Sequence, residues 1–195
     1  MRLLIITCSL LSVLLCACSH SPRKNYFILN ATAVNSEKHS NEEIDQLIGI
    51  GPIEIADYID RLPILYTQSD NTLVIAENDY WAEPLNKGIA RVIADNLGAL
   101  NPKRSFTNFP WRMDNKPTYS LRLQVHNLSC NSKEASIDAS WELINNITKI
   151  SLQRRHFIRS VPAQANPKAL TQAYNKLLGD LALEMDMLLK STSPP

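Results

Sequence analysis

A short apolar run that ends in a cysteine constrains how the rest of the chain can be interpreted. Apolar residues follow Arg2 as far as Leu15, and Ala17-Cys18 comes shortly after. A positive start, an apolar centre and a small residue at the cut are the anatomy of a signal peptide. Leucine three residues before the cysteine, with alanine one before it, is typical of a bacterial lipoprotein. The pattern predicts cleavage between Ala17 and Cys18 and a lipid on Cys18.

The apolar run is too short to cross a bilayer as a helix, since about 20 apolar residues are needed. Polar and charged residues with one proline fill positions 19–24, so nothing lengthens it. The alternative is an ordinary secretory signal cut at another bond, with Cys18 incidental. By analogy with bacterial lipoprotein sorting, Ser19 in place of aspartate favours the outer membrane, with the domain on its periplasmic face.

Length and charge limit the classes of protein that fit. After cleavage, the remaining chain suits one domain with one sizeable core. We expect a signal peptide over 1–17, a lipidated tether over 18–25, a domain over 26–190 and a disordered tail over 191–195. Without Arg2, 19 basic residues face 19 acidic ones. This balance argues against a nucleic-acid binder, which usually carries a basic stripe; the basic run 154–156 is interpreted as a solvated strand face.

Cysteine usage agrees with an envelope protein. Of the four cysteines, two leave with the signal peptide and Cys18 is lipidated, so Cys130 alone remains. No disulfide within the chain is then possible, and no paired-cysteine zinc spacing is present. Cys130 follows Asn127-Leu128-Ser129, which we interpret as a loop. Its thiol is either reactive or incidental.

Hydrophobic periodicity predicts an α/β or α+β domain with one mixed sheet and helices packed on it. Alternating or β-branched stretches predict strands, including a hairpin around residues 69–71. An apolar stripe from Trp81 to Leu97, capped by Asn78 or Asp79 and stopped by Gly98, predicts one helix. A second begins at Asn166-Pro167. The predicted strands cover residues 26–29, 47–55, 64–68, 72–76, 121–125, 135–143 and 147–158, with loops or connections over 30–46 and 101–116.

Catalytic constellations are not apparent in the sequence. The four histidines lie on the tether, a loop and two strands, without metal partners at short helical or strand spacing. The Gly49-Ile50-Gly51 pair has no third glycine opening a helix, as a nucleotide loop requires. Acidic residues before the first helix are explained by the helix dipole. We expect no cofactor, no metal site and no enzymatic activity, although a triad can be assembled from distant residues.

Several segments, in order, resemble the PqiC (YmbA) family of ABC-type transport auxiliary lipoproteins. The most specific are Tyr58-Ile59-Asp60-Arg61 and the stretch Trp81-Ala82-Glu83-Pro84-Leu85. The matching segments also include the lipoprotein processing site, 26–29, 48–52, 91–97, 141–143 and the last helix. Ala56 stands where the family is expected to have proline, Pro63-Ile64 is shifted, and an insertion near 35–41 is longer than usual.

The resemblance implies a single three-layer α/β/α domain with a mixed sheet flanked by two main helices. It also implies a non-enzymatic accessory subunit of an MCE/ABC-type lipid transport system. Such a subunit docks, as a homo-oligomeric ring, an MCE-domain protein that bridges the periplasm. We expect Tyr58, Arg61 and Trp111 at the partner interface; Tyr58 and Arg61 could instead form a structural turn. Two other classes stay open: a lipid-anchored periplasmic hydrolase, and a structural envelope lipoprotein without an MCE partner.

Overall fold

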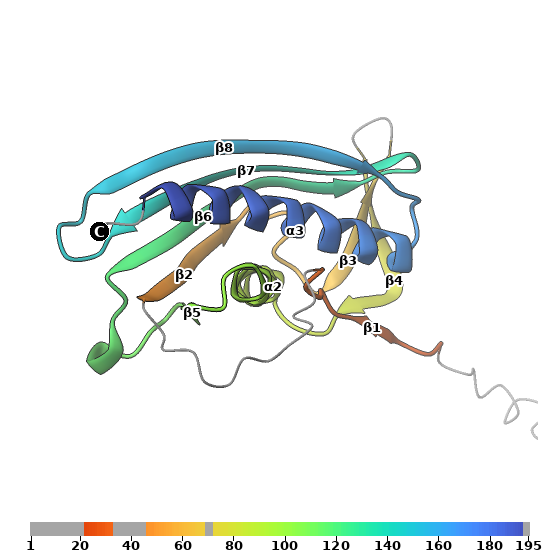
Figure 1. Cartoon of the computed structure of the whole chain (residues 1–195). Helices are drawn as coiled ribbons and strands as arrows, with labels where there is room; N and C mark the ends of the chain where they lie inside the picture. The colour runs from red at the N-terminus through yellow and green to blue at the C-terminus, as the bar shows by residue number, and fades with distance from the viewer. Residues whose placement is uncertain (1–21, 33–45, 69–71, 193–195) are drawn as a thin grey trace, which may run out of the picture.

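The computed structural model describes residues 22–32, 46–68 and 72–192, and these form one α/β domain with two sheets and two long helices (Figure 1). The predicted signal peptide and residues 33–45 of the predicted loop 30–46 lie outside the described residues. The elements are β1 (Asn25–Phe27), β2 (Gln46–Ile55), β3 (Pro63–Thr67), β4 (Leu73–Trp81), α2 (Leu85–Leu100), β5 (Arg104–Asn108), the 3-10 helix η1 (Met113–Asn115), β6 (Tyr119–Cys130), β7 (Glu134–Asn145), β8 (Ser151–Pro162) and α3 (Pro167–Thr192).

The larger sheet is mixed and has five strands in the order β5-β2-β6-β7-β8. β2 pairs in parallel with both β5 and β6, whereas β6, β7 and β8 form an antiparallel meander. The meander has the alternation of a sheet with one buried and one wet face. Leu121, Leu123 and Val125 are buried, and Arg122 and Gln124 between them are exposed. The predicted meander and the predicted strand 47–55 are therefore confirmed, but the third meander strand begins at Ser151 and not at residue 147, because residues 147–150 form the turn.

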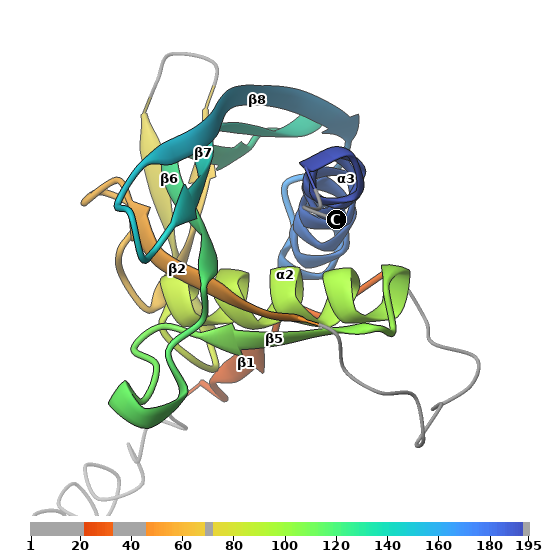
Figure 2. The ribbon, with the colours of Figure 1, turned by 60° about the vertical axis from the view of Figure 1, so that its left-hand side comes forward.

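Both helices pack on the buried face of this sheet. α2 lies against β2 and β5, α3 lies against β7 and β8, and the helices contact each other. Figure 2 shows the five strands curving around the two helices. The α/β class, the mixed sheet and the two main helices are confirmed. The two helices lie side by side on one face of the large sheet, and Arg122 and Gln124 on the opposite face of the meander are exposed.

The smaller sheet has the strand order β1-β4-β3 and packs against β6 through β3 and against α3 through β1. β3 and β4 form the predicted antiparallel hairpin, and β1 adds in parallel to the other edge of β4. Trp81, at the end of β4, stacks on Tyr174 of α3 with ring centroids 6.2 Å apart. Trp81 and Trp141 are both buried. The small sheet is thereby joined to the first third of α3.

The start of the first helix was predicted wrongly. β4 continues to Trp81, whose N–H donates to the Leu62 carbonyl at 2.7 Å, and α2 begins only at Leu85. Pro84 disfavours helical backbone in the residue before it. Strand pairing therefore extends to Trp81. This residue lies in the core, as its apolar character suggests, but it belongs to the strand and not to the helix. At the other end, α2 passes Gly98 and ends at Leu100.

Two further differences concern strands. β5 lies within the stretch predicted as a connection, and it pairs with β2 over five residues. Cys130 was predicted in a loop, but it is the last residue of β6 and is fully buried. The second helix agrees with its predicted cap: the Ala169 N–H donates to Asn166 Oδ1 at 2.9 Å. α3 reaches Thr192, and residues 193–195 lie outside the described residues.

Candidate functional site

The segment that follows the predicted tether is joined to the domain by strand pairing. β1 places Asn25 opposite Asp79 and Phe27 opposite Trp81. Asn25 Nδ2 donates to Asp79 Oδ1 at 2.9 Å, and the Ala82 N–H donates to the Phe27 carbonyl at 2.8 Å. A strand of three residues makes few ladder bonds, so the position of this segment also depends on the contacts that follow it.

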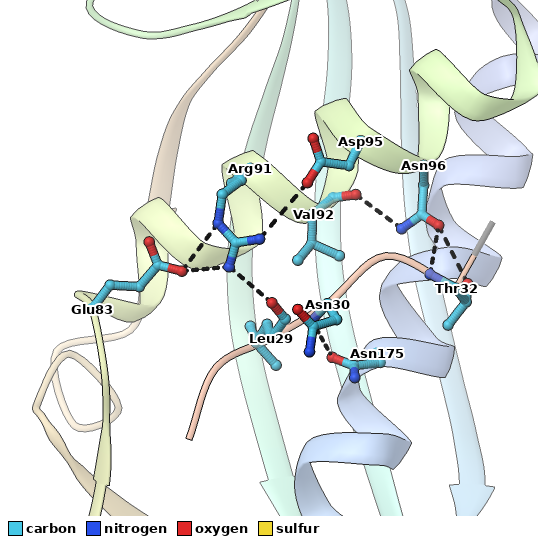
Figure 3. Close-up of polar contacts among 9 residues, drawn as sticks. All are labelled: Leu29, Asn30, Thr32, Glu83, Arg91, Val92, Asp95, Asn96 and Asn175. Carbon is cyan, nitrogen blue, oxygen red and sulfur yellow. Dashed lines mark hydrogen bonds and ion pairs between the residues drawn. The ribbon is translucent and has the colours of Figure 1, made fainter. Parts of the chain in front are cut away.

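Arg91 of α2 makes the first of these contacts (Figure 3). Its Nη2 donates to the Leu29 carbonyl at 2.8 Å and to Glu83 Oε1 at 2.5 Å, and its Nε donates to the same Oε1 at 3.2 Å. Asp95, one turn further along α2, lies 3.7 Å from Nη1. The planar guanidinium offers several donors in a fixed geometry. One side chain thus connects the N-terminal segment, the β4–α2 connection and the helix.

Two asparagines hold the next residues of the segment. Asn96 of α2 is buried, and its Oδ1 accepts from the Thr32 N–H at 3.0 Å and from Thr32 Oγ1 at 3.3 Å. Its Nδ2 donates to the Val92 carbonyl at 2.9 Å. Asn175 Oδ1, on α3, accepts from the Asn30 N–H at 2.9 Å. The backbone N–H groups of Asn30 and Thr32 are therefore hydrogen-bonded to side chains, as backbone donors removed from water must be.

We call this set of residues the N-terminal clamp, and it fixes residues 29–32 between α2 and α3. Its members are Leu29, Asn30, Thr32, Glu83, Arg91, Asn96 and Asn175. Sequence reasoning did not identify it. The available signal was Asn96, a polar residue one turn after Val92 on the otherwise apolar face of α2.

The opposite end of the long strands carries a compact turn between β7 and β8. Asn145 Oδ1 accepts from the N–H groups of Ile147 and Thr148 at 2.9 and 3.1 Å. Asn146 is buried, and its Nδ2 donates to the Pro117 carbonyl at 3.0 Å. Lys149 has a φ of 63°, a left-handed conformation that is uncommon for a residue other than glycine or asparagine. The turn is therefore fixed to the segment before β6.

We call the exposed side chains at this end the distal tip: Lys116, Ile147, Lys149 and Ile150. Ile147 is 75% exposed and Ile150 is 59% exposed. The charge of Lys116, and more weakly that of Arg122 on β6, lowers the pKa of Lys149. Like charges and bare apolar side chains therefore lie together at one end of the sheet.

The open face of the sheet contains a shallow cavity of about 370 Å³. Arg122, Glu142 and Arg154 lie in one row across β6, β7 and β8. Arg154 Nη2 donates to Glu142 Oε2 at 3.0 Å. Burial raises the pKa of Glu142, but hydrogen bonds from Arg154 and Ser151 and the charges of both arginines outweigh it and lower the pKa. The row is thus largely satisfied by its own charges.

Two histidines on this face pair with polar neighbours. His126 Nε2 lies 2.8 Å from Ser140 Oγ, and His156 Nε2 lies 2.6 Å from Asp138 Oδ1. A triad needs one histidine between the serine and the carboxylate, whereas here each histidine has a different partner. Within the described part of the chain, no group of three or more histidine, cysteine or acidic residues could hold a metal ion.

The three predicted interface residues are divided between the two ends of β2. Tyr58 lies in the turn after β2, where its hydroxyl donates to Asn127 Oδ1 at 2.6 Å, and burial raises its pKa. Arg61 is exposed in the same turn. Trp111 is half-buried at the other end, where its ring covers Gly49 and packs edge-on against Phe109 at 5.1 Å. The structure therefore brings Tyr58 and Arg61 together and leaves Trp111 apart.

The structure describes the surroundings of Cys130 but not those of the predicted anchor. The Cys130 thiol is buried, and burial raises its pKa, which disfavours the nucleophilic thiolate. Ala17 and Cys18 lie outside the described residues. Among the described helices, none is both long and apolar enough to cross a membrane.

Comparison with known proteins agrees with the motifs found in the sequence. A family described as "ABC-type transport auxiliary lipoprotein component" matches residues 27–186. The intermembrane transport lipoprotein PqiC of Escherichia coli (strain K12) is 27% identical over 79 residues, which are 40% of this chain and 42% of that protein. PqiC of Shigella flexneri matches to the same extent. The chain thus spans less than half the length of the curated relatives it matches.

Solved structures show the same fold. A crystal structure of a protein described as uncharacterized has a TM-score of 0.69 at 18% identity, covering 86% of this chain and 99% of that one. A crystal structure of a Xanthomonas campestris protein has a TM-score of 0.62 at 13% identity, covering 83% and 92%. The sequence match extends from β1 to near the end of α3, and therefore this chain belongs to the ABC-type transport auxiliary lipoprotein component family.

Proposed function

We propose that this protein is a non-enzymatic accessory subunit of an intermembrane lipid transport system of the MCE/ABC type. In this proposal the chain is cut between Ala17 and Cys18, and the lipid on Cys18 holds it at the periplasmic face of the outer membrane. The domain, as a ring of copies, docks an MCE-domain protein that extends from the inner membrane. The family match over 27–186 is the observation that carries the proposal.

The N-terminal clamp supports the anchoring part of the proposal. Seven residues, 18–24, precede β1, and a chain of that length spans at most about 25 Å. A lipid on Cys18 would therefore hold the domain close to its membrane. A clamp that fixes residues 29–32 suits this role, because it holds the segment after the tether against both helices.

The docking part of the proposal uses the two ends of β2. Arg61 and Tyr58 form one candidate contact, and Trp111 with Phe109, which is 51% exposed, forms another. Trp, Tyr and Arg are enriched among the residues that dominate binding energy. In the proposed ring, one of these contacts meets the MCE-domain protein and the other meets a neighbouring copy.

The hydrolase alternative has one specific set of residues to test. Among the residues that the structure describes, Ser140 and His126 on the open face have the contact that a nucleophile and its base require. Ser140→Ala should leave envelope integrity and partner binding unchanged if the protein is an accessory subunit. Loss of an esterase or lipase activity in this variant would favour the hydrolase.

The decisive experiment compares Cys18→Ala with the wild-type protein, and Cys130→Ala serves as the matched cysteine control. Mass spectrometry of the mature wild-type N-terminus should show a lipid-modified Cys18. Cys18→Ala should leave the membrane fraction and impair membrane integrity, while its domain still binds the MCE-domain protein in a crosslinked pull-down. An unmodified N-terminus, or a variant that stays in the membrane, would overturn the anchor. Failure of the wild type to bind the partner would overturn the docking.

A further inference from the structure

The distal tip combines two kinds of side chain that face solvent at one turn. Ile147 and Ile150 are 75% and 59% exposed, and Leu152, at the start of β8, is 38% exposed. The hydrogen bonds of Asn145 and Asn146 fix the turn, so these side chains are presented by a defined backbone rather than by a loose loop. Exposed apolar side chains that gather in this way commonly mark an interaction site.

Positive charge gathers beside the same turn. Lys116 lies close enough to Lys149 for the two charges to interact. Within the described residues, no ion pair joins Lys116 or Lys149 to an acidic side chain, whereas Arg122 faces Glu142 across the strands. Lys149 occupies a left-handed conformation in which glycine would be less strained. The tip therefore has a lysine at a position whose backbone conformation favours glycine.

The composition of the tip distinguishes between two kinds of partner. Centres of protein interfaces are depleted in lysine and enriched in aromatic residues and arginine. The tip instead presents isoleucine between lysines. Surfaces that enter the boundary between headgroups and acyl chains combine apolar side chains with Lys and Arg, and each basic residue near an anionic leaflet strengthens the contact.

We propose that the distal tip is a membrane contact that binds anionic phospholipid, with Ile147 and Ile150 entering the acyl boundary and Lys116 and Lys149 meeting the phosphates. The tip and β1 lie at opposite ends of the long strands (Figure 1). A domain that is anchored near β1 and touches the bilayer with its distal tip would lie along the membrane surface. Because an anchor makes the second contact intramolecular, even a weak tip interaction would be effective.

The test places a fluorescent probe at the tip of the full-length lipidated protein. Thr148→Cys lies between the two isoleucines and leaves them intact, and an environment-sensitive maleimide labels it because the native Cys130 is buried. Ser132→Cys, in the exposed turn between β6 and β7, is the matched control. Both are reconstituted into vesicles of phosphatidylethanolamine alone, or with phosphatidylglycerol at one part in four.

Labelled Thr148→Cys should show a blue-shifted, brighter emission in the phosphatidylglycerol vesicles, reversed by high salt, while labelled Ser132→Cys stays unchanged. Lys149→Gln and Lys116→Gln should each weaken the tip interaction about fivefold, and Ile147→Ser with Ile150→Ser should abolish it. A Thr148 probe that stays as solvent-exposed as the control would overturn the proposal. So would a probe that is shielded only when a purified periplasmic protein is added, which would assign the tip to a protein partner.

A second experiment uses soluble protein and does not depend on the lipid anchor. Cys18→Ala protein, purified from the periplasmic fraction, should co-sediment with phosphatidylglycerol vesicles more than its Ile147→Ser, Ile150→Ser derivative does. Equal sedimentation of the two would overturn the tip contact whether or not Cys18 is lipidated. The lipidation result and the tip result can therefore fail separately.

Discussion

The two ends of the long strands use polar groups in opposite ways. At the β1 end, the N-terminal clamp pairs the backbone of residues 29–32 with side chains of both helices. At the other end, the turn is equally well hydrogen-bonded internally, but its lysines and isoleucines face solvent. The polar groups of the clamp are bonded within the protein and hold the N-terminal segment in place. The charged and apolar side chains of the distal tip are exposed and can contact another molecule.

This difference separates stability from recognition along one molecule. Changes in the clamp should alter the free energy of unfolding, because they leave buried groups without partners. Changes at the tip should alter binding and leave stability nearly unchanged, since exposed substitutions usually have small effects. Substitutions at both ends of the long strands test that division.

Arg91→Ala should lower the free energy of unfolding by about 2 kcal/mol, because it removes charge-assisted bonds to Glu83 and to the Leu29 carbonyl. Urea unfolding with a circular-dichroism readout would measure it. Arg154→Ala is the control: its side chain is 74% exposed in an ion pair with Glu142, and it should cost less than about 1 kcal/mol. Equal losses in the two variants would mean that the clamp contributes no more than a surface pair.

Gly179→Ala should destabilise the domain by about 1 kcal/mol even though alanine favours helices. A Cβ at this position of α3 would collide with Thr32 Oγ1, which belongs to the clamp. The clash should disappear in Thr32→Ala protein, where Gly179→Ala becomes neutral or stabilising. Gly98→Ala in α2, where an added Cβ would lie 4.0 Å from Phe106, should stabilise in either background. A double-mutant cycle without coupling would show that Thr32 does not rest on α3.

Lys149→Gly should change stability in the opposite direction, raising the free energy of unfolding by up to about 1 kcal/mol, because glycine tolerates a positive φ. The same substitution should weaken binding to phosphatidylglycerol vesicles. Thermal unfolding and vesicle co-sedimentation measure the two effects. A variant that is less stable than wild type would indicate that the lysine side chain supports the fold, and the contrast between the two ends would then be lost.

Ile147→Ser together with Ile150→Ser should leave the free energy of unfolding within about 0.5 kcal/mol of wild type, since both side chains are exposed. Chemical denaturation is the measurement, and Ile137→Ser, which removes a fully buried side chain, is the contrasting control. A marked loss from the tip variant would show that these isoleucines pack in the folded protein.

Residue patterns predicted the elements whose sequence period matches their burial. The alternation of β6 and β7 and the cap of α3 at Asn166 are confirmed. The patterns failed where pairing decided the outcome. β5 has no strong alternation of its own and forms by parallel pairing with β2, and Trp81 is held in β4 because its N–H is bonded to Leu62. Distant partners thus overrode local preference in both places.

Residue patterns alone carry the anchor motif, the family resemblance, and the apolar faces of the helices and strands. The folded chain was needed to show that both helices share one face of the sheet, that Arg91 and Asn96 hold residues 29–32, and that Lys116 lies beside the turn at Lys149. The difference is one of range. Periodicity and capping act over a few residues, whereas these contacts join groups that are far apart in the sequence and meet only when the sheet has formed.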